Sequence, residues 1–368
     1  MAALDPGKDP ARRCLPVPEW PDPDRAAWNA ALDRGDILGD GGLACRWSEA
    51  TRRTMASAYG RWLTHIKRQG DLDPDAAPQD RVLPERVRAY IEELQATVAP
   101  VTVHGRICGL KKTLRVMAPD ADLGWLRRAE RRLAADAVPV RDKEQKIRNS
   151  AELFGLGIRL MEGAERDARM RANRRALRYR DGALIAFLAA RPLRRRTLAG
   201  MRIGRNLKRL YDHYVILFEA GDTKGGRLFE MPLPHALTPY IDRYLLEHRP
   251  VLLKGRRSDR VWITHMGTAM TAGSIYVRIR DLTERELGVA INPHLFRDCL
   301  ATSLIVHDPE NVRTAATLLG HASLETTNRH YNQAKALEAV GHYQQQICRL
   351  RRRLLDAGNA PPPSSGTL

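Results

Sequence analysis

Apolar residues recur every three or four positions along much of the chain, and the first clear run begins just after residue 47. In residues 48–70, the large apolar side chains fall at Met55, Tyr59, Trp62 and Ile66. This spacing places them on one face of an amphipathic helix, for which Ser48 is a suitable N-cap. A second helix is predicted over residues 83–95, where Pro84 would occupy the first turn.

Two further helices complete this first region. Residues 100–119 carry an apolar stripe made of Val103, Ile107, Leu110, Leu114 and Met117. Residues 123–133 have the pattern of a fourth helix. We therefore predict a small all-helical domain over residues 47–135. Residues 1–46 are rich in Pro, Asp and Gly and lack periodicity, which predicts a flexible arm.

A second domain is expected after a charged segment that contains one proline, residues 136–149, which predicts a linker. This domain, residues 150–356, opens with helical patterns. Strand-like runs at residues 213–219 and 227–234 flank the connection AGDTKGG, and glycines between β-rich runs predict a hairpin. The predicted fold class is mainly α with a small β-sheet. Residues 357–368 predict a disordered tail.

The chain carries a large excess of positive charge. Its 368 residues include 61 Lys and Arg against 43 Asp and Glu, a formal net charge of +18. Such an excess opposes folding by self-repulsion unless a polyanion offsets it, which favours double-stranded DNA or another nucleic acid over an anionic membrane surface. The sequence contains no run of about eighteen apolar residues, the length that would span a bilayer. We also expect no secretion signal. Five cysteines without a CxxC pair favour a reducing compartment and argue against structural zinc. A cytoplasmic, DNA-facing protein is therefore expected.

Seven arginines lie close together between two predicted helices. They are Arg166, Arg169, Arg171, Arg174, Arg175, Arg178 and Arg180. A tract of this kind is either the solvated face of a helix or a surface that binds phosphates, and the sequence leaves both readings open.

The first candidates for chemistry are His294 and Arg297, which are three residues apart and so are expected on one face of a helix. An arginine binds an anionic oxygen through paired hydrogen bonds, while a histidine supplies a proton or a hydrogen bond. Upstream, Arg194 lies four residues before Leu198 and is expected to lean towards the core. Arg195 is three residues before the same leucine, so spacing alone does not separate the two arginines.

Three more residues complete an ordered set. Lys224 falls in the hairpin connection, His321 follows a Leu-Gly turn, and Tyr331 lies further along the same helical region. The segments that carry the whole set are PLRRRTL, DTKGGRLFEMPLP, PHLFRDCLATSL and LLGHASLETTNRHY. In this order they resemble the tyrosine recombinase (phage integrase) family, and the resemblance covers the chain from about residue 151 to residue 350.

The resemblance implies three phosphate-binding residues. Arg194 and Arg297 would clamp the scissile phosphate, and His321 would bind the same group. A phosphodiester transition state gathers charge on its non-bridging oxygens, and preorganised cations compensate this charge without a metal. No metal, other cofactor or ATP is therefore expected.

The resemblance also implies the residues that move bonds and protons. Tyr331 would attack the phosphate and form a 3′-phosphotyrosyl intermediate, Lys224 would protonate the 5′-oxygen leaving group, and His294 would assist proton transfer. Tyrosine is a weak nucleophile at its free pKa of about 10, so neighbouring cations and a base must activate it.

The architecture implied is a two-domain C-shaped clamp around duplex DNA, made of an all-α core-binding domain and the catalytic domain. Four protomers would act on two sites through a Holliday junction in a bacterial cytoplasm, and accessory DNA-bending factors are compatible with this scheme. The helix expected over residues 336–355 would pack on a neighbouring protomer. The choice among integration, excision, transposition and dimer resolution stays open.

The chain departs from the family pattern in three places. Arg191-Pro192 stands where Thr-Gly is usual, and Thr197 stands where an acidic residue is frequent. His330 occupies the commonest position of the nucleophile, which makes Tyr343 the second candidate after Tyr331. Two other functions remain open: a type IB topoisomerase that relaxes DNA, and a DNA-binding relative with a degraded site.

Overall fold

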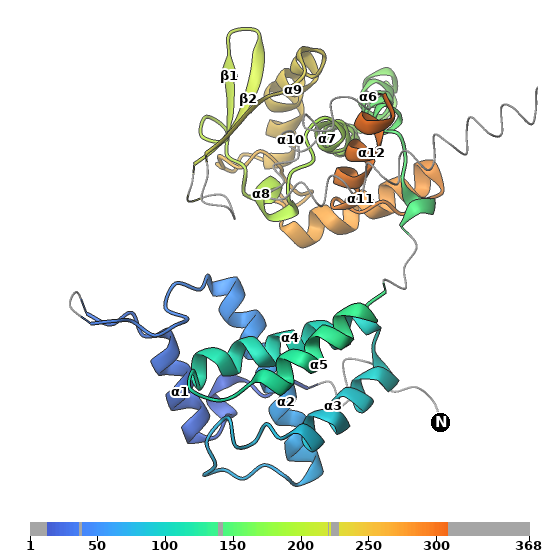
Figure 1. Ribbon diagram of the computed structural model, residues 1–368. Coiled ribbons are helices and arrows are strands. Elements are labelled where there is room, and N and C mark those ends of the chain that lie inside the picture. The colour runs from blue at the N-terminus through green and yellow to red at the C-terminus, as the bar shows by residue number, and fades with distance from the viewer. Residues whose placement is uncertain (1–12, 37–38, 139–142, 220, 222–227, 308–368) are drawn as a thin grey trace, which may run out of the picture. The chain divides into compact units, whose positions relative to one another are not determined.

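The chain forms two compact units, Met1–Asp142 and Lys143–Leu368, each with its own hydrophobic core. Figure 1 shows their helices and strands. The boundary between the units falls within the segment predicted as a linker, residues 136–149. The computed structural model describes residues 13–36, 39–138, 143–219, 221 and 228–307.

The first unit is all-helical in the residues described. Its helices are α1 (Asp22–Leu32), α2 (Glu49–Gln69), α3 (Pro84–Thr97), α4 (Pro100–Met117) and α5 (Gly124–Ala135), preceded by the 3-10 helix η2 (Val17–Glu19). Helix α2 begins where predicted, because the Ser48 side chain accepts a hydrogen bond from the Thr51 amide at 3.2 Å. It ends at Gly70, whose φ of 82° favours glycine.

Residues 13–36 form part of this unit's core, so the prediction of a flexible arm was wrong for them. Leu15, Trp20 and Trp28 are buried together with aromatic side chains of α2. The Leu15 amide donates to the Gly60 carbonyl at 3.1 Å. A Cβ atom at Gly60 would lie 2.1 Å from the Leu15 oxygen, so only glycine permits this approach. The Pro- and Asp-rich composition concealed these anchors because they are few and irregularly spaced.

The second unit is mainly helical with one small sheet, which confirms the predicted fold class. Its 3-10 and α-helices are η3 (Glu144–Lys146), α6 (Ser150–Arg166), α7 (Ala172–Ala190), α8 (Arg195–Gly200), η5 (His235–Leu237), α9 (Thr238–Arg243), α10 (Arg249–Leu253), α11 (Ala272–Leu287) and α12 (Leu295–His307), with the π-helix η6 at Tyr244–His248. The strands are β1 (Leu207–Leu210), β2 (His213–Phe218) and β3 (Phe229–Pro232). They form an antiparallel sheet in the order β1-β2-β3.

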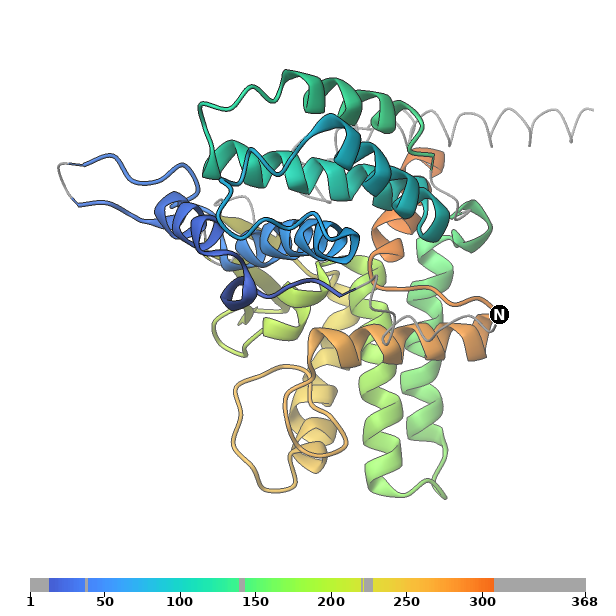
Figure 2. The ribbon, with the colours of Figure 1, turned by 90° about the horizontal axis from the view of Figure 1, so that it is seen from below.

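Helix α7 is the centre of the second unit. Figure 1 shows it among α6, α10, α11 and α12, and its side chains from Ala183 to Ala189 are all buried. Helices α6 and α7 run side by side (Figure 2) and approach closely at two glycines. A Cβ atom at Gly182 would lie 2.6 Å from the Gly157 oxygen. These small residues therefore fix the distance between the helix that precedes Arg194 and its neighbour.

A buried carboxylate ties α11 to α7. Asp181 accepts from Arg180 at 2.6 Å and from the Arg278 Nε at 2.7 Å, and Asp181 and Arg180 are both buried. The remaining Arg180 nitrogen donates to the Ile263 carbonyl at 2.8 Å. Because a buried charge is tolerated only when it is paired, this network holds α11 across α7, as Figure 2 shows.

Candidate active site

Arg297 is held in the first turn of α12 by a backbone oxygen from another segment. Its side chain is buried, and its Nη1 donates to the Pro192 carbonyl at 2.8 Å. Pro192 lies between α7 and α8, two residues before Arg194. The bond therefore joins two of the sequence motifs that are more than a hundred residues apart.

The start of α12 is fixed by Asn292. Its side-chain oxygen accepts from the His294 amide at 2.9 Å and from the Leu295 amide at 3.1 Å, which satisfies donors that a helix N-terminus leaves without a partner. His294 thus lies in the turn before α12, one residue outside the helix where it was expected, and its side chain is exposed. Arg297 follows in the first helical turn.

Arg194 lies close enough to His294 and Arg297 to lower the pKa of both. Burial lowers the pKa of Arg297 to about 10, with a further contribution from the charge of Arg194. Partial desolvation lowers the pKa of the His294 imidazole although the residue is exposed, and the cations Arg297, Lys143 and Arg194 act in the same direction, whereas Asp298 opposes them. The site is therefore a concentration of positive charge, which an anion would stabilise.

The structure separates Arg194 from Arg195. Arg194 is the N-cap of α8, with φ −62° and ψ 139°, and its side chain is exposed. The expectation that it leans towards the core was wrong, because helical spacing does not apply to a residue that precedes the helix. The Arg195 guanidinium lies 5.8 Å from the centroid of the Tyr276 ring on α11, a cation–π contact. Arg194 is consequently the arginine that acts on His294 and Arg297.

Further residues fix α12 to the start of α6. The Ser150 amide donates to the Ser303 hydroxyl at 2.9 Å, and the Arg148 amide contacts Cys299 Sγ at 3.4 Å. Burial raises the pKa of Cys299 to about 11, so this thiol is not a nucleophile near neutral pH. The sequence offered no signal for these contacts, since each joins segments about 150 residues apart.

Two residues near the site were missed at the sequence level. Asp298 directly follows Arg297 and offsets part of the positive charge on both Arg297 and His294, so its position beside the motif was a usable signal. Lys143 acts on His294 from the segment predicted as a linker, where nothing in the local pattern marks it.

The other predicted site residues lie outside the described part of the chain. These are Lys224, His321 and Tyr331, together with the alternatives His330 and Tyr343. Of the six predicted catalytic residues, the described chain therefore brings together Arg194, His294 and Arg297.

The arginine tract does not form one continuous surface. Arg180 is buried in the Asp181 network, Arg166 pairs with Glu162 at 2.6 Å, and Arg175 donates to the carbonyl oxygens of the α6–α7 connection. The remaining four arginines, together with Asp167 and Met170, line an open hollow of about 590 Å³: Arg169, Arg171, Arg174 and Arg178. The phosphate-binding reading therefore applies to these four at most.

Among the helices described, none is both long and apolar enough to cross a membrane.

The domain that contains this site matches the model of a known protein family. Residues 159–338, which include Arg194, His294 and Arg297, match the model of the phage integrase family. Residues 159–338 thus form a domain of the tyrosine recombinase (phage integrase) family. The resemblance of its ordered motifs to this family is thereby confirmed.

Tyrosine recombinases named XerD are similar to parts of this chain. The Pseudomonas aeruginosa protein is 34% identical over 114 residues, which are 31% of this chain and 38% of that relative. The Neisseria meningitidis serogroup B protein is 30% identical over 28% of this chain and 35% of its own length. The Lacticaseibacillus casei protein is 26% identical over 66% of this chain and 75% of the relative. The first two alignments thus span little more than a third of those relatives.

Two crystal structures share the fold at low sequence identity. One is XerH site-specific recombinase bound to palindromic difH substrate in a post-cleavage complex, with a TM-score of 0.56 and 14% identity over 90% of this chain and 100% of that one. The other is the pre-cleavage complex of XerH with difH, with a TM-score of 0.54 and 14% identity over 87% of this chain and 97% of that one.

Proposed function

We propose that this protein is a site-specific DNA recombinase that cleaves and rejoins strands through a tyrosine. In the first step, the Tyr331 hydroxyl loses its proton with the assistance of His294, its oxygen attacks the phosphorus, and the bond from phosphorus to the 5′-oxygen breaks. Lys224 gives the leaving 5′-oxygen a proton, so that one proton passes overall from Tyr331 to that oxygen. A 3′-phosphotyrosyl link remains. In the second step, the 5′-hydroxyl of a partner strand attacks this link and releases Tyr331. The phosphodiester energy is conserved, so no ATP is consumed.

The observation that carries this proposal is the convergence of Arg194, His294 and Arg297 from two segments about a hundred residues apart. Cations that are already in place cost no reorganisation when charge develops on the phosphate oxygens. Arg297 is oriented by the Pro192 carbonyl, and Arg194, whose charge acts on Arg297, is exposed, so a phosphate can reach Arg194 from solvent.

The DNA surface proposed for the first unit lies over α2 and α4. A hollow of about 490 Å³ between these helices is lined by small and polar residues and by two arginines, Arg53 and Arg106. A Cβ atom at Gly105 of α4 would meet nothing within 4 Å, whereas one at Gly109 would lie 2.6 Å from the Ala58 Cβ, so Gly109 permits the close approach of α2. Arginines at the edge of a shallow hollow suit the phosphate backbone, which supplies most of the sequence-independent affinity for DNA.

The assembly proposed is a clamp of the two units around duplex DNA, with four protomers acting on two sites through a Holliday junction. Exchange between two duplexes requires four strand breaks, and one nucleophile per protomer then requires four protomers. The DNA-bound XerH complexes share the fold and so support DNA as the substrate.

The proposal is tested with a nicked substrate that loses its 5′-hydroxyl fragment after cleavage, so that a covalent adduct accumulates. We expect the unmodified protein to form the adduct and Tyr331→Phe to bind the DNA without forming it. An adduct that persists in Tyr331→Phe and disappears in Tyr343→Phe would identify Tyr343, in place of Tyr331, as the nucleophile. No adduct with any substrate on which the protein binds specifically would favour a DNA-binding relative.

A second assay separates recombination from relaxation. Two labelled duplexes with different flanks exchange strands in a recombinase reaction, whereas a type IB topoisomerase only relaxes a supercoiled plasmid. Relaxation without site preference and without exchanged products would contradict the recombinase proposal while leaving the tyrosine chemistry intact.

A further inference from the structure

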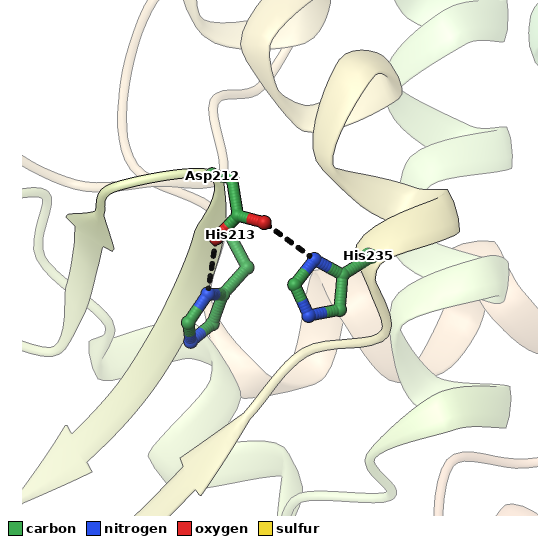
Figure 3. Close-up of side chains that lie close together, drawn as sticks. All are labelled: Asp212, His213 and His235. Carbon is green, nitrogen blue, oxygen red and sulfur yellow. Dashed lines mark hydrogen bonds and ion pairs between the residues drawn. The ribbon is translucent and has the colours of Figure 1, made fainter.

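Two imidazoles and a carboxylate that are not among the candidate active-site residues meet at one end of the sheet. Asp212 lies in the turn between β1 and β2, His213 is the first residue of β2, and His235 lies in η5 after β3. The His213 Nδ1 lies 3.0 Å from one oxygen of Asp212, and the His235 Nδ1 lies 3.2 Å from the other. Figure 3 shows both rings turned towards the carboxylate.

The backbone around this cluster is fixed by the sheet. Leu210 pairs with His213 across a two-residue turn, in which Tyr211 has a φ of 51°, a conformation that side-chain-bearing residues rarely adopt. The Leu233 amide donates to the Tyr214 carbonyl at 2.7 Å, which keeps the segment after β3 beside the start of β2. The histidines therefore face each other because of backbone pairing, with their ring centroids 4.9 Å apart.

We propose that Asp212, His213 and His235 bind a divalent transition-metal ion of the zinc class. One ligand atom from each residue lies within 4.8 Å of the other two. Tetrahedral ligands at zinc's usual bond lengths are about 3.3 Å apart, so small side-chain rotations would close the site. Two nitrogen ligands and one oxygen suit Zn²⁺, Co²⁺ or Ni²⁺, whereas Mg²⁺ and Ca²⁺ prefer oxygen ligands alone.

The electrostatics and access of the cluster favour metal binding. A hydrogen bond from His213, aided by the backbone, lowers the pKa of Asp212, so its carboxylate is available as an anionic ligand. Arg209, the arginine two residues before the turn, is engaged by Asp242 at 3.1 Å. Asp212 and His235 are largely exposed, so an ion can enter without any opening of the fold, and water can fill the fourth position.

The metal would join the β1–β2 turn to η5 and so brace one end of the sheet. The strands leave the sheet at the other end, where β2 finishes at Phe218 and β3 begins at Phe229. The three residues of this site are not members of the Arg194–His294–Arg297 cluster, and the proposal does not depend on the function proposed for that cluster.

The experiment compares metal binding by full-length proteins that have first been stripped with EDTA. Titration with Co²⁺, followed by its visible absorption and by calorimetry, should show one more tightly bound ion for the unmodified chain than for His213→Asn/His235→Asn. The matched control is His265→Asn, which changes an exposed histidine outside the cluster and should behave like the unmodified chain. Differences between proteins, not totals, are compared because other histidines also bind metal.

A second variant tests the carboxylate. Asp212→Asn should weaken Zn²⁺ binding at this site by at least the roughly 10–100-fold that loss of an outer-shell partner costs, while Mg²⁺ should not compete. Equal Co²⁺ stoichiometry and spectra in the unmodified chain and the double variant, with circular dichroism unchanged, would overturn the proposal. The cluster would then be an ion pair between Asp212 and protonated imidazoles.

Discussion

The Arg297 guanidinium donates to the carbonyl oxygen of Pro192 at 2.8 Å. This bond orients a buried cation with a backbone acceptor, and it places the start of α12 beside the segment that ends in Arg194. A side-chain acceptor can be removed by a single substitution, but a carbonyl is present whatever residue occupies position 192. This contribution to the orientation of Arg297 therefore does not depend on which side chain is present at position 192.

Arg297→Ala should reduce cleavage by about 100-fold or more at saturating protein, with a modest change in DNA binding, because the lost contact grows stronger in the transition state. Arg297→Lys should recover little of the loss, since an ammonium group cannot reproduce the planar fork of the guanidinium. The measurement is single-turnover cleavage at saturation. Arg285→Ala, an exposed arginine of α11 paired with Glu286, is the control. Normal cleavage by Arg297→Ala at saturating protein would show that Arg297 contributes to DNA binding and not to the chemical step.

DNA binding should be coupled to proton uptake at His294. Partial desolvation and the neighbouring cations lower the pKa of His294 in the free protein, and a bound phosphate would raise it. His294 then has a higher pKa in the DNA-bound protein than in the free protein. The affinity for DNA should therefore increase as the pH falls through the pKa of the bound protein, and it should level off below the pKa of the free protein. Calorimetry with Tyr331→Phe near pH 6.5, in two buffers of different ionisation enthalpy, counts the protons. The His294→Gln protein should take up fewer protons when it binds DNA. A number of protons equal to that of Tyr331→Phe would contradict the assignment of proton uptake to His294.

The four arginines of the α6–α7 hollow should affect affinity without affecting chemistry. Neutralising Arg169 and Arg174 should weaken DNA binding and lower its salt dependence by roughly one unit of slope per lost phosphate contact. Cleavage at saturation should stay close to that of the unmodified chain. Binding curves at several salt concentrations provide the measurement. An unchanged slope would assign these arginines to a solvated surface.

Trp28→Ala should destabilise the first unit by about 3–5 kcal/mol, as expected for a large core side chain replaced by alanine. Trp28 is 4% exposed and packs edge-on against Trp20 at 5.6 Å. Leu43→Ala, at a position that is 64% exposed, should change stability by no more than about 0.5 kcal/mol. Urea unfolding of the full chain followed by circular dichroism checks both. Equal effects of the two variants would restore the flexible-arm interpretation of residues 13–36.

Cleavage should continue in excess EDTA, because the proposed phosphate site uses arginine and histidine in place of a metal. The ion proposed at Asp212, His213 and His235 would be removed by the same treatment, so metal loss and cleavage can be scored in one sample. Abolished cleavage that magnesium restores would contradict the mechanism. A lowered melting temperature with intact cleavage would agree with a bracing metal.

Local patterns predicted those parts of the molecule that depend on local interactions. The apolar spacing of Tyr59, Trp62 and Ile66 marked α2, and Ser48 marked its start. Strand β1 was missed because its residues LKRL do not alternate between apolar and polar, and it is a strand only through its pairing with β2. Tertiary pairing of this kind overrides the weak propensity of a four-residue segment.

The candidate site shows the same limit. Ordered motifs singled out Arg194, His294 and Arg297, but spacing could not distinguish Arg194 from Arg195. The distinction comes from Tyr276, about eighty residues later, which holds Arg195. The contribution of Lys143 likewise depends on how the segment before α6 folds back, which no local pattern records.

The distribution of tryptophans between the two cores has a practical consequence for spectroscopy. Five of the six tryptophans belong to the first unit, and the second has Trp262 alone, stacked on Tyr244 at 5.5 Å and edge-on to Phe187. The intrinsic emission of the whole chain therefore reports mainly on the first unit. Trp262→Phe would leave a full-length chain whose tryptophan fluorescence follows that unit only, so that docking of the first unit on DNA can be timed by itself.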